Sequence, residues 1–283
     1  MAAQLPPTSR LDKALVARGL ARSRDEALEL IDGMSVRVNG AIADKASRVI
    51  KRGDSLLVME ATPRFVGRGA RKLVGALDEL NIATQGVNFC DLGSSTGGFT
   101  QVLLERGANL VVAVDVGRGQ MSERVAKDPR VILLEGLNAR KLTRAEYQLP
   151  AIDNVVGDLS FISLEKFTSV IVTEILQGSG SFLLLVKPQF ELDRQTVSRG
   201  RGVVREPSDW ARAITRVSQS YLEAGAQIVA VVPSPLRGSS GNQEFFIHGH
   251  VGIASVSPGS NDLESLVSQA VSRAQPREED NSP

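Results

Sequence analysis

The stretch Asp91-Leu92-Gly93-Ser94-Ser95-Thr96-Gly97-Gly98-Phe99-Thr100 decides the fold of the larger part of this 283-residue chain. An apolar run from Val87 to Asp91 precedes the glycines and predicts a strand, and a helical pattern from Gly98 to Arg106 follows them. Glycines at such a junction let the backbone turn tightly and approach a ligand closely. The stretch therefore predicts a ligand-binding loop at the carboxyl end of a strand.

Strand and helix patterns alternate along the rest of this part of the chain. A helical pattern begins at Gly69 and carries Leu73, Ala76, Leu77 and Leu80 on one face. Further strands are expected at Leu110–Asp115, Val131–Leu134, Ile152–Asp158, Ser181–Lys187, Gln227–Val232 and Glu244–His248, and further helices at Leu164–Leu176 and Trp210–Ala224. This alternation predicts an α/β fold with a doubly wound, Rossmann-like sheet, helices on both faces and a ligand site beyond the carboxyl ends of the strands.

The spacing of the glycines, G-x-x-x-G-G, disfavours two common nucleotide-binding classes. It differs from the G-x-G-x-x-G of dinucleotide sites, and it lacks the Gly-Lys-Ser/Thr ending of a P-loop. A dehydrogenase and a nucleoside triphosphatase are therefore disfavoured. A methionine-derived sulfonium cofactor, which has no phosphate to cradle, suits a loop of this type.

Two polar residues after the next strands complete a candidate cofactor site. Asp115 ends a strand about 20 residues after the glycines, where a carboxylate accepts hydrogen bonds from a ribose diol; a turn with Gly117 is the alternative. Asn138 is a weaker candidate for the adenine edge, with a simple turn as its alternative. The cofactor-binding candidates are Asp91, Gly93, Ser94, Ser95, Thr96, Gly97, Gly98, Phe99, Asp115 and Asn138.

Composition and charge limit the function classes. No apolar run approaches the roughly 18–20 residues that a membrane-spanning helix needs, and Met1 to Arg10 lacks the apolar region of a secretion signal. Cys90 is the only cysteine, which argues against a disulfide or a cysteine-rich zinc site and fits a reducing cytoplasm. The net charge of +1 hides a basic front end. Residues 1–75 hold 14 Lys/Arg against 8 Asp/Glu (+6), residues 76–272 hold 17 against 21 (−4), and residues 273–283 hold 2 against 3 (−1).

Residues 10–60 read as a small unit of their own. Two short helices are predicted, the first ended by Gly19 and the second capped by Ser23, with Glu26 completing a capping box. A strand at 36–38, a hairpin turn at Asn39-Gly40 and a strand at 55–59 follow. The pattern predicts two helices packed on a small sheet.

Basic residues gather around these two helices: Arg10, Lys13, Arg18, Arg22, Arg24 and Arg37. A solvated helix face is the plain interpretation of such a charge run. The spaced order of Arg10-Leu11-Asp12, Arg18 to Arg24, Leu30-Ile31 and Val38-Asn39-Gly40, however, resembles the S-four RNA-binding domain, a module of proteins that bind structured RNA. This resemblance covers nearly all of residues 10–60 and implies that the six basic residues contact RNA.

Charged residues border three apolar strands of the larger unit. The segments are Gly157-Asp158-Leu159-Ser160-Phe161-Ile162-Ser163, Leu185-Val186-Lys187-Pro188-Gln189-Phe190-Glu191 and Gly241-Asn242-Gln243-Glu244-Phe245, each placed where a strand should end. With Arg68 to Leu73 they bring two lysines and two carboxylates to one edge of the sheet. Two Lys–acid bridges that close the sheet are the structural alternative to a catalytic role.

Taken in order, these motifs resemble the TlyA family of ribosomal RNA 2′-O-methyltransferases, whose catalytic domain is similar to that of the FtsJ-type ribose methyltransferases. The resemblance covers residues 10 to about 250 and implies a class I methyltransferase fold, S-adenosyl-L-methionine as cofactor, and transfer to a cytidine ribose in 16S RNA, 23S RNA or both. The family's Lys-Asp-Lys-Glu tetrad falls on Lys72, Asp158, Lys187 and Glu244. Arg118 stands where an aromatic residue is usual, which concerns the rim of the cofactor pocket and not the reaction.

The chemistry of ribose methylation suggests a role for each member of the tetrad. A lysine acts as a base when burial and a neighbouring cation favour its neutral form. Lys187 is expected to be the base or to stabilise the oxyanion, with Asp158 fixing its ammonium group. Lys72 is the second cation, and Glu244 holds Lys72 or the ribose. No metal is expected.

The chain is thus expected to comprise an S-four-like RNA-binding domain at 1–60, a linker at 61–68, an FtsJ-like methyltransferase domain at 69–272 and a disordered tail at 273–283. Ribosomal RNA within ribosomal subunits is the expected partner, and a cytoplasmic monomer without membrane contact is the expected state. Residues 1–75 are expected to supply most of the RNA affinity.

Two features of the larger unit and two alternative functions remain open. Phe190 is a candidate for stacking on the target base, with a core role as its alternative. Arg199-Gly200-Arg201-Gly202 and Arg205 suggest a mobile loop that faces RNA, or a plain solvated loop. The alternative functions are an RNA-binding protein with an inactive methyltransferase domain and a haemolysin, which the missing spanning segment disfavours.

Overall fold

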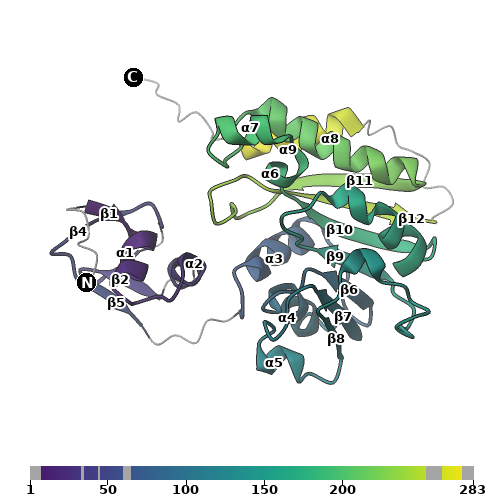
Figure 1. Cartoon of the computed structure of the whole chain (residues 1–283), viewed down its shortest axis with the longest axis horizontal. Coiled ribbons are helices and arrows are strands. Elements are labelled where there is room, and N and C mark those ends of the chain that lie inside the picture. Colours follow the sequence, from purple (N-terminus) through teal and green to yellow (C-terminus); the bar gives the residue numbers. More distant parts are fainter. Residues whose placement is uncertain (1–7, 33–34, 44, 60–64, 253–262, 276–283) are drawn as a thin grey trace. The chain divides into compact units, whose positions relative to one another are not determined.

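The computed structural model describes residues 8–32, 35–43, 45–59, 65–252 and 263–275 (Figure 1). The chain divides into two compact units, Met1–Arg68 and Gly69–Pro283. Within the described ranges, no helix is long and apolar enough to cross a lipid bilayer. In the same ranges, no group of three or more His, Cys, Asp or Glu side chains is arranged to hold a metal ion.

The first unit packs two helices, α1 (Leu11–Ala17) and α2 (Arg24–Asp32), against short strands. The strands are β1 (Thr8–Arg10), β2 (Val36–Val38), β3 (Ala41–Ile42), β4 (Val49–Lys51) and β5 (Leu56–Val58). β1 pairs with β4, and a separate antiparallel sheet has the order β3-β2-β5. The core is formed by apolar side chains of both helices, β2 and β4, such as Leu11, Leu15, Ile31, Val36 and Ile50.

Local sequence signals explain where these elements begin and end. Gly19 takes a φ of 71° just after α1, and Asn39 and Gly40 take φ values of 53° and 83° in the two-residue turn between β2 and β3. Positive φ at both turn positions is the type I′ geometry that joins hairpin strands. Ser23 Oγ accepts a hydrogen bond from Glu26 N at 3.1 Å where α2 begins. The helix end at Gly19, the Asn39-Gly40 turn and the Ser23 cap are confirmed, whereas β1 and β4 were not predicted.

The second unit is built on a seven-stranded sheet with the spatial order β11-β12-β10-β9-β6-β7-β8. Its strands are β6 (Asn88–Leu92), β7 (Leu110–Asp115), β8 (Val131–Glu135), β9 (Asn154–Gly157), β10 (Gly180–Val186), β11 (Ala226–Pro233) and β12 (Phe245–Val251). The strands from β10 to β8 are parallel, whereas β12 runs antiparallel to β10 and β11. The predicted Rossmann-like sheet is confirmed, with one antiparallel strand that the sequence pattern does not reveal.

Helices cover both faces of this sheet because side chains alternate between two cores. On β12, Phe245 contacts Trp210 of α8 (Pro207–Glu223) with ring centroids 5.8 Å apart, whereas Phe246 stacks on Phe99 of α4 (Gly98–Glu105) at 6.3 Å. α3 (Gly69–Leu80) packs beside α4 on one face, and α8 lies on the other. α9 (Leu263–Ala274) packs on α8 and β11.

Several helical segments differ from the expected ones. The helix expected at Leu164–Leu176 is broken into a 3₁₀ turn at Leu164–Phe167 and a π-helical turn at Val170–Ile175, where β-branched side chains disfavour a continuous α-helix. Short helices α5 (Glu123–Ala126), α6 (Pro188–Glu191) and α7 (Arg194–Arg199) are not predicted by the sequence pattern. α9 extends to Ala274, past the expected start of the tail at residue 273, and residues 276–283 lie outside the described residues.

Candidate active site

Three charged side chains meet at the edge where the parallel strands end. Asp158 directly follows β9, and Lys187 directly follows β10. Glu244 does not end a strand, as its segment was expected to do; it directly precedes β12. Because β12 is antiparallel to β10, its first residue, Phe245, pairs with the last residue of β10, Val186. The start of β12 therefore lies at the same edge as the carboxyl ends of β9 and β10.

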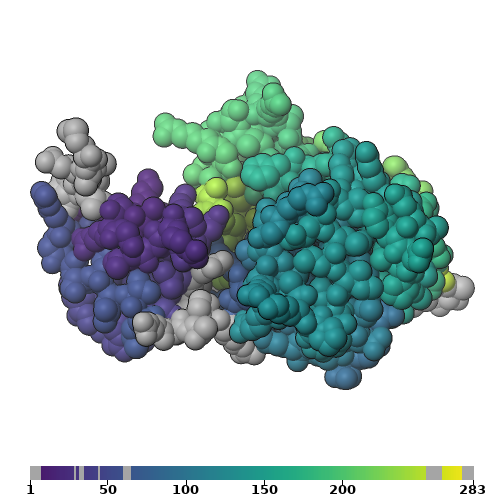
Figure 2. All heavy atoms as spheres, turned by 60° about the horizontal axis from the view of Figure 1, so that its bottom comes forward, coloured from purple at the N-terminus to yellow at the C-terminus, as the bar shows by residue number. Residues whose placement is uncertain are grey.

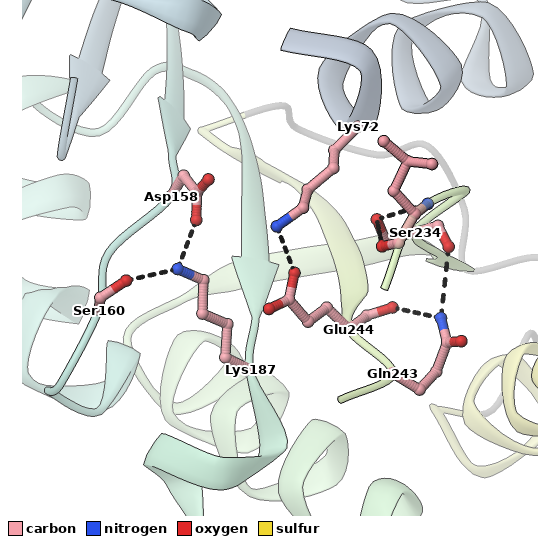
Figure 3. Close-up of polar contacts among 8 residues, drawn as sticks. Lys72, Asp158, Ser160, Lys187, Ser234, Gln243 and Glu244 are labelled. Atoms are coloured by element: carbon pink, nitrogen blue, oxygen red, sulfur yellow. Dashed lines mark hydrogen bonds and ion pairs between the residues drawn. The ribbon is translucent and has the colours of Figure 1, made fainter. Parts of the chain in front are cut away.

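Lysines and carboxylates form two ion pairs at this edge (Figure 3). Lys187 Nζ lies 2.6 Å from Asp158 Oδ1 and donates a hydrogen bond to Ser160 Oγ at 2.6 Å. Lys72, near the start of α3, has its Nζ 2.6 Å from Glu244 Oε2. The side chains of Lys72 and Glu244 are only 8% and 3% exposed, so this pair is almost completely removed from water.

The two pairs influence each other electrostatically. Burial by itself raises the pKa of the Asp158 carboxyl, but attraction to Lys187 and to Lys72 outweighs burial and lowers that pKa below its usual range. Asp158 is therefore ionised at neutral pH and holds the Lys187 ammonium group. Lys72 acts on Asp158 although its own partner is Glu244, so the four side chains form one charged cluster.

Close backbone packing fixes both carboxylates of the cluster. A Cβ atom on Gly238 would lie 2.5 Å from Glu244 Oε1, and a Cβ atom on Gly69 would lie 3.2 Å from Asp158 Oδ2. The amide of Gln243 donates to the carbonyl oxygen of Glu244 at 2.9 Å and holds the chain just before β12. A glycine at 238 therefore leaves the space that the Glu244 carboxylate occupies.

A pocket of about 490 Å³ extends from the glycine loop to Asp158 and Ser160. Such a volume is typical of small-molecule sites. Its lining includes Gly93, Ser95, Asp115, Val116, Gln120, Leu137, Asn138, Asp158, Ser160 and Phe161. Gly93 takes a φ of 80°, and a Cβ atom there would lie 3.0 Å from the carbonyl oxygen of Asp158, so the loop passes β9 at a distance that favours glycine.

Four of the ten cofactor candidates line this pocket: Gly93, Ser95, Asp115 and Asn138. Asp115 accepts hydrogen bonds from Ser95 N at 2.8 Å and from Gly117 N at 2.7 Å, so it closes the expected turn and also borders the pocket. Asn138 Oδ1 accepts from Arg140 N at 3.1 Å and caps a 3₁₀ turn at Ala139–Lys141. The turn interpretation of Asn138 therefore holds, although its side chain also borders the pocket.

The other six candidates support the loop and, in the described chain, are not among the residues that line the pocket: Asp91, Ser94, Thr96, Gly97, Gly98 and Phe99. Asp91 is fully buried, and Thr100 Oγ1 donates to its Oδ2 at 2.6 Å. Gly97 takes a φ of 92° just before α4, and a Cβ atom there would lie 3.1 Å from Val125. The sequence pattern does not separate the two sets, because which residues of the loop border the pocket depends on how the loop packs against segments that are distant in the sequence.

An exposed aromatic side chain at the pocket was not among the candidates. Phe161 is 89% exposed and has a φ of 64°, a strained conformation for a bulky residue. Its ring centroid lies 5.0 Å from that of Phe190, and the Phe190 ring centroid lies 5.9 Å from Lys187 Nζ. The Ser-Phe-Ile sequence contains an apolar residue in a loop, but only the structure shows that Phe161 and not Phe190 is exposed to this extent.

A buried carboxylate ties the loop of Phe161 to the segment that follows Lys187. Glu191 is 3% exposed, and its Oε1 accepts a hydrogen bond from Leu164 N at 3.0 Å. Burial raises the pKa of the Glu191 carboxyl, against the hydrogen bonds from Ser163 and Leu164. Glu191 thereby joins the two segments that carry Asp158 and Lys187.

Two of the six expected RNA-binding residues of the first unit share one buried partner. Arg10 and Arg24 approach the Asp12 carboxylate with Nε–O distances of 3.0 and 2.8 Å. Burial raises the pKa of Asp12, but hydrogen bonds from the two arginines lower it overall. The arginine side chains are 46% and 43% exposed, so Asp12 fixes two guanidinium groups at the surface.

The remaining four residues differ in exposure. Arg18 donates to three carbonyl oxygens of residues 51–54 at 2.6–3.4 Å, and Arg37 donates to the carbonyl oxygen of Gly40 at 2.8 Å. Lys13 is exposed, and the Arg22 side chain is 91% exposed despite an ion pair with Glu26. Arg18 and Arg37 thus support loops of the domain, whereas Lys13 and Arg22 present their charge to solvent.

Comparison with known families covers both units. The model of FtsJ-like methyltransferases matches residues 65–251, a range that contains the pocket and all four charged residues of the cluster. The chain belongs to the FtsJ-like methyltransferase family. A model of the S4 domain matches residues 9–56, so this methyltransferase carries an S4 domain in its first unit.

Individual relatives of this FtsJ-like methyltransferase span nearly the same length. A Mycobacterium tuberculosis protein named 16S/23S rRNA (cytidine-2′-O)-methyltransferase TlyA is 46% identical over 240 residues, covering 84% of this chain and 88% of the relative. Hemolysin A of Brachyspira hyodysenteriae is 33% identical, covering 84% of this chain and 98% of the relative. A solved Streptococcus thermophilus structure described as a hemolysin has a TM-score of 0.69 at 33% identity, covering 93% of this chain and 96% of that one. The resemblance to the TlyA family is confirmed.

Proposed function

We propose that this methyltransferase transfers a methyl group from S-adenosyl-L-methionine to the 2′-hydroxyl of a cytidine in the 16S or 23S RNA of ribosomal subunits. The observation that carries the proposal is the cluster of two lysine–carboxylate pairs at the end of the pocket. Relatives that are 46% and 30% identical bear the names of rRNA (cytidine-2′-O)-methyltransferases. The S4 domain supports RNA as the substrate.

The pocket suits S-adenosyl-L-methionine in size and in its polar groups. Each oxygen of the Asp115 carboxylate accepts one backbone hydrogen bond and keeps a second lone pair for a ribose hydroxyl. Val116, which is 74% exposed, and Leu137 offer apolar surface for the adenine ring. When bound, the cofactor supplies an electrophilic methyl group on a positively charged sulfur.

Lys187 is the proposed base. A ribose hydroxyl is a weak nucleophile and loses its proton as the new carbon–oxygen bond forms. The ammonium group of Lys187 would first release a proton to solvent, and the neutral amine would then accept the proton of O2′ as the methyl group is transferred. Asp158 and Ser160 hold its Nζ in position. The Ser160 hydroxyl accepts a hydrogen bond from Nζ in both the ammonium and the neutral amine, so this contact leaves the lone pair of the amine free for the proton of O2′.

The other members of the cluster position charge and substrate. Lys72 supplies positive charge for the oxygen that becomes negative during transfer, and Glu244 keeps Lys72 oriented. The exposed ring of Phe161 supports stacking with a cytosine that has left its own RNA stack. Positioning of the two reactants is expected to supply most of the remaining acceleration.

The test uses unmodified small and large ribosomal subunits and cofactor labelled on its methyl group. The wild type is expected to place label on a cytidine 2′-oxygen, and Lys187→Ala is expected to bind the cofactor without transferring label. Lys166→Ala, which removes an exposed lysine of the same unit, is the matched control. Absence of label on every RNA with bound cofactor would favour an RNA-binding protein without activity, and turnover by Lys187→Ala would remove Lys187 from the mechanism.

A further inference from the structure

The second unit carries a basic loop of its own, between α7 and α8. The loop has the sequence Arg199-Gly200-Arg201-Gly202-Val203-Val204-Arg205. Its three arginines are exposed, and none of them has an ion-pair partner among the residues whose structure is described. In Figure 2 the green segment around residue 200 projects from the surface of its unit. These cations are therefore available to an external anion.

Hydrogen bonds from two buried side chains hold the backbone of this loop, for which the sequence suggested a mobile loop that faces RNA or a plain solvated loop. Asn242, which is 1% exposed, accepts a hydrogen bond from Val204 N at 2.8 Å and donates one to the carbonyl oxygen of Gly202 at 2.9 Å. The indole of Trp210 donates to the carbonyl oxygen of Val204 at 3.0 Å. Gly202 N donates a hydrogen bond to the carbonyl oxygen of Val197 in α7 at 3.0 Å. The arginines thus extend from a backbone that is already ordered, which reduces the entropy that a bound partner must offset.

The anchor of the loop lies next to the candidate active site. Asn242 is two residues before Glu244, whose carboxylate pairs with Lys72. Gly238 N donates to the carbonyl oxygen of Asn242 at 2.9 Å, so the turn that packs against Glu244 also supports Asn242. A partner held by the arginines would therefore bind beside the end of the sheet where methyl transfer is proposed.

The charge of the loop and its position favour a polyanion over an acidic protein patch. Arg194, in α7, is also exposed. Residues 193–206 therefore contain four arginines and only two carboxylates, those of Asp193 and Glu206. Asp193 is occupied in part, since it accepts from Thr196 N at 2.9 Å. Guanidinium groups spaced along a fixed loop match successive phosphates of a nucleic-acid backbone.

We propose that loop 199–205 is an RNA-backbone anchor of the methyltransferase unit, which holds the phosphates that flank the target nucleotide. The proposal rests on the proposed function, because the anion it names is the substrate RNA. It also divides the RNA contacts between the two units, whereas the charge distribution along the sequence assigned most of the affinity to residues 1–75.

The anchor predicts a specific change in the salt dependence of the reaction. In a plot of log affinity against log salt concentration, each phosphate contact to a single strand makes the downward slope steeper by about 0.7. Replacement of two arginines therefore lowers the slope by about 1.4. Between 50 and 200 mM salt, the wild type is expected to lose about sevenfold more kcat/KM than such a variant.

The experiment compares Arg199→Gln/Arg201→Gln with a control of equal charge change, Lys127→Gln/Arg273→Gln. Lys127 directly follows α5, Arg273 lies in α9, and both side chains are exposed. Methylation of ribosomal subunits is measured from 50 to 200 mM salt. The loop variant is expected to show the smaller slope with kcat within about twofold of the wild type, while the control retains the wild-type slope. Arg199→Lys/Arg201→Lys keeps the charge and is expected to retain most of the slope.

Each outcome decides between the two proposals. The anchor is overturned if Arg199→Gln/Arg201→Gln has the same slope and the same kcat/KM as the control. It is also overturned if the glutamine and lysine variants both show a lower kcat with no change in slope. A wild type that binds the cofactor but labels no ribosomal RNA overturns the proposed function instead. Calorimetric titration with S-adenosyl-L-methionine establishes that each variant is folded, because the anchor predicts an unchanged Kd for the cofactor.

Discussion

The pair of Lys72 and Glu244 offers a direct test of how this active site is held together. Replacement of Lys72 by Met removes the ammonium group and leaves a carboxylate that is 3% exposed without its partner. Breaking a buried pair from one side costs about 3–5 kcal/mol, because the remaining charge stays out of water. We therefore expect the free energy of unfolding of Lys72→Met to fall by about this amount at neutral pH.

A second substitution separates loss of the pair from loss of packing. In Lys72→Met/Glu244→Gln the buried charge is gone, and we expect recovery of at least about 2 kcal/mol relative to the single variant. Methyl transfer is expected to be absent from both. Lys166→Met, at an exposed lysine, serves as the control and is expected to match the wild type.

The assay is urea unfolding of the cofactor-free protein followed by tryptophan fluorescence. Trp210 is the only tryptophan and is buried in α8, so the signal reports on the second unit alone. A single variant that is no less stable than the double variant would refute the reasoning, since it would show that Glu244 does not need Lys72 as a counter-charge.

Four further predictions follow from the same geometry. Gly238→Ala is expected to lower kcat at least tenfold with a small effect on cofactor binding, because its Cβ would lie 2.5 Å from Glu244 Oε1; unchanged kcat would show that the loop yields without moving the carboxylate. Burial raises the pKa of Asp91 to about 7 from 3.8, so between these pH values the folded chain holds a proton that the unfolded chain releases. The free energy of unfolding is therefore expected to fall by up to about 4 kcal/mol as the pH rises through this range. Urea titrations from pH 4 to 8 are expected to show a weaker pH dependence of the free energy of unfolding for Asp91→Asn. Asp115→Asn is expected to weaken S-adenosyl-L-methionine by about 10- to 100-fold in calorimetry, through loss of a charged acceptor, and an unchanged Kd would exclude the ribose contact. Phe161→Ala is expected to raise KM for the ribosomal subunit by about tenfold without changing the Kd of the cofactor, whereas Phe161→Tyr is expected to preserve both.

Elements with a local cause could be predicted from the sequence. Asn39-Gly40 specifies the β2–β3 turn because both positions take positive φ, and the glycines around Gly93 predict the strand–loop–helix junction because the loop passes so close to β9. The β-branched residues at 170–173 weaken an α-helix locally, but the π-helical turn that replaces it depends on packing and was not predicted.

The roles of single polar residues were harder to predict. Arg18 and Arg22 belong to the same basic stretch, but Arg18 donates to loop carbonyls while Arg22 is 91% exposed. Asp91 and Asp115 both end strands beside the glycine loop, but one is buried against Thr100 and the other borders the pocket. In each pair, the difference in role follows from a difference in burial, and burial depends on neighbours that are distant in the sequence.

The sequence by itself determined the S4 domain, the Rossmann-like sheet, the glycine loop and the four residue types of the Lys-Asp-Lys-Glu cluster, because these are encoded by periodicity and by short ordered motifs. The pairing of Lys187 with Asp158 was expected from the sequence. Only the tertiary structure decided that Glu244 pairs with Lys72, that Phe161 is exposed and that loop 199–205 is held by Asn242. The physical reason is the antiparallel course of β12, which returns residues 242–244 to the edge where the parallel strands end. Strand direction depends on pairing between segments far apart in the chain, which no local pattern specifies.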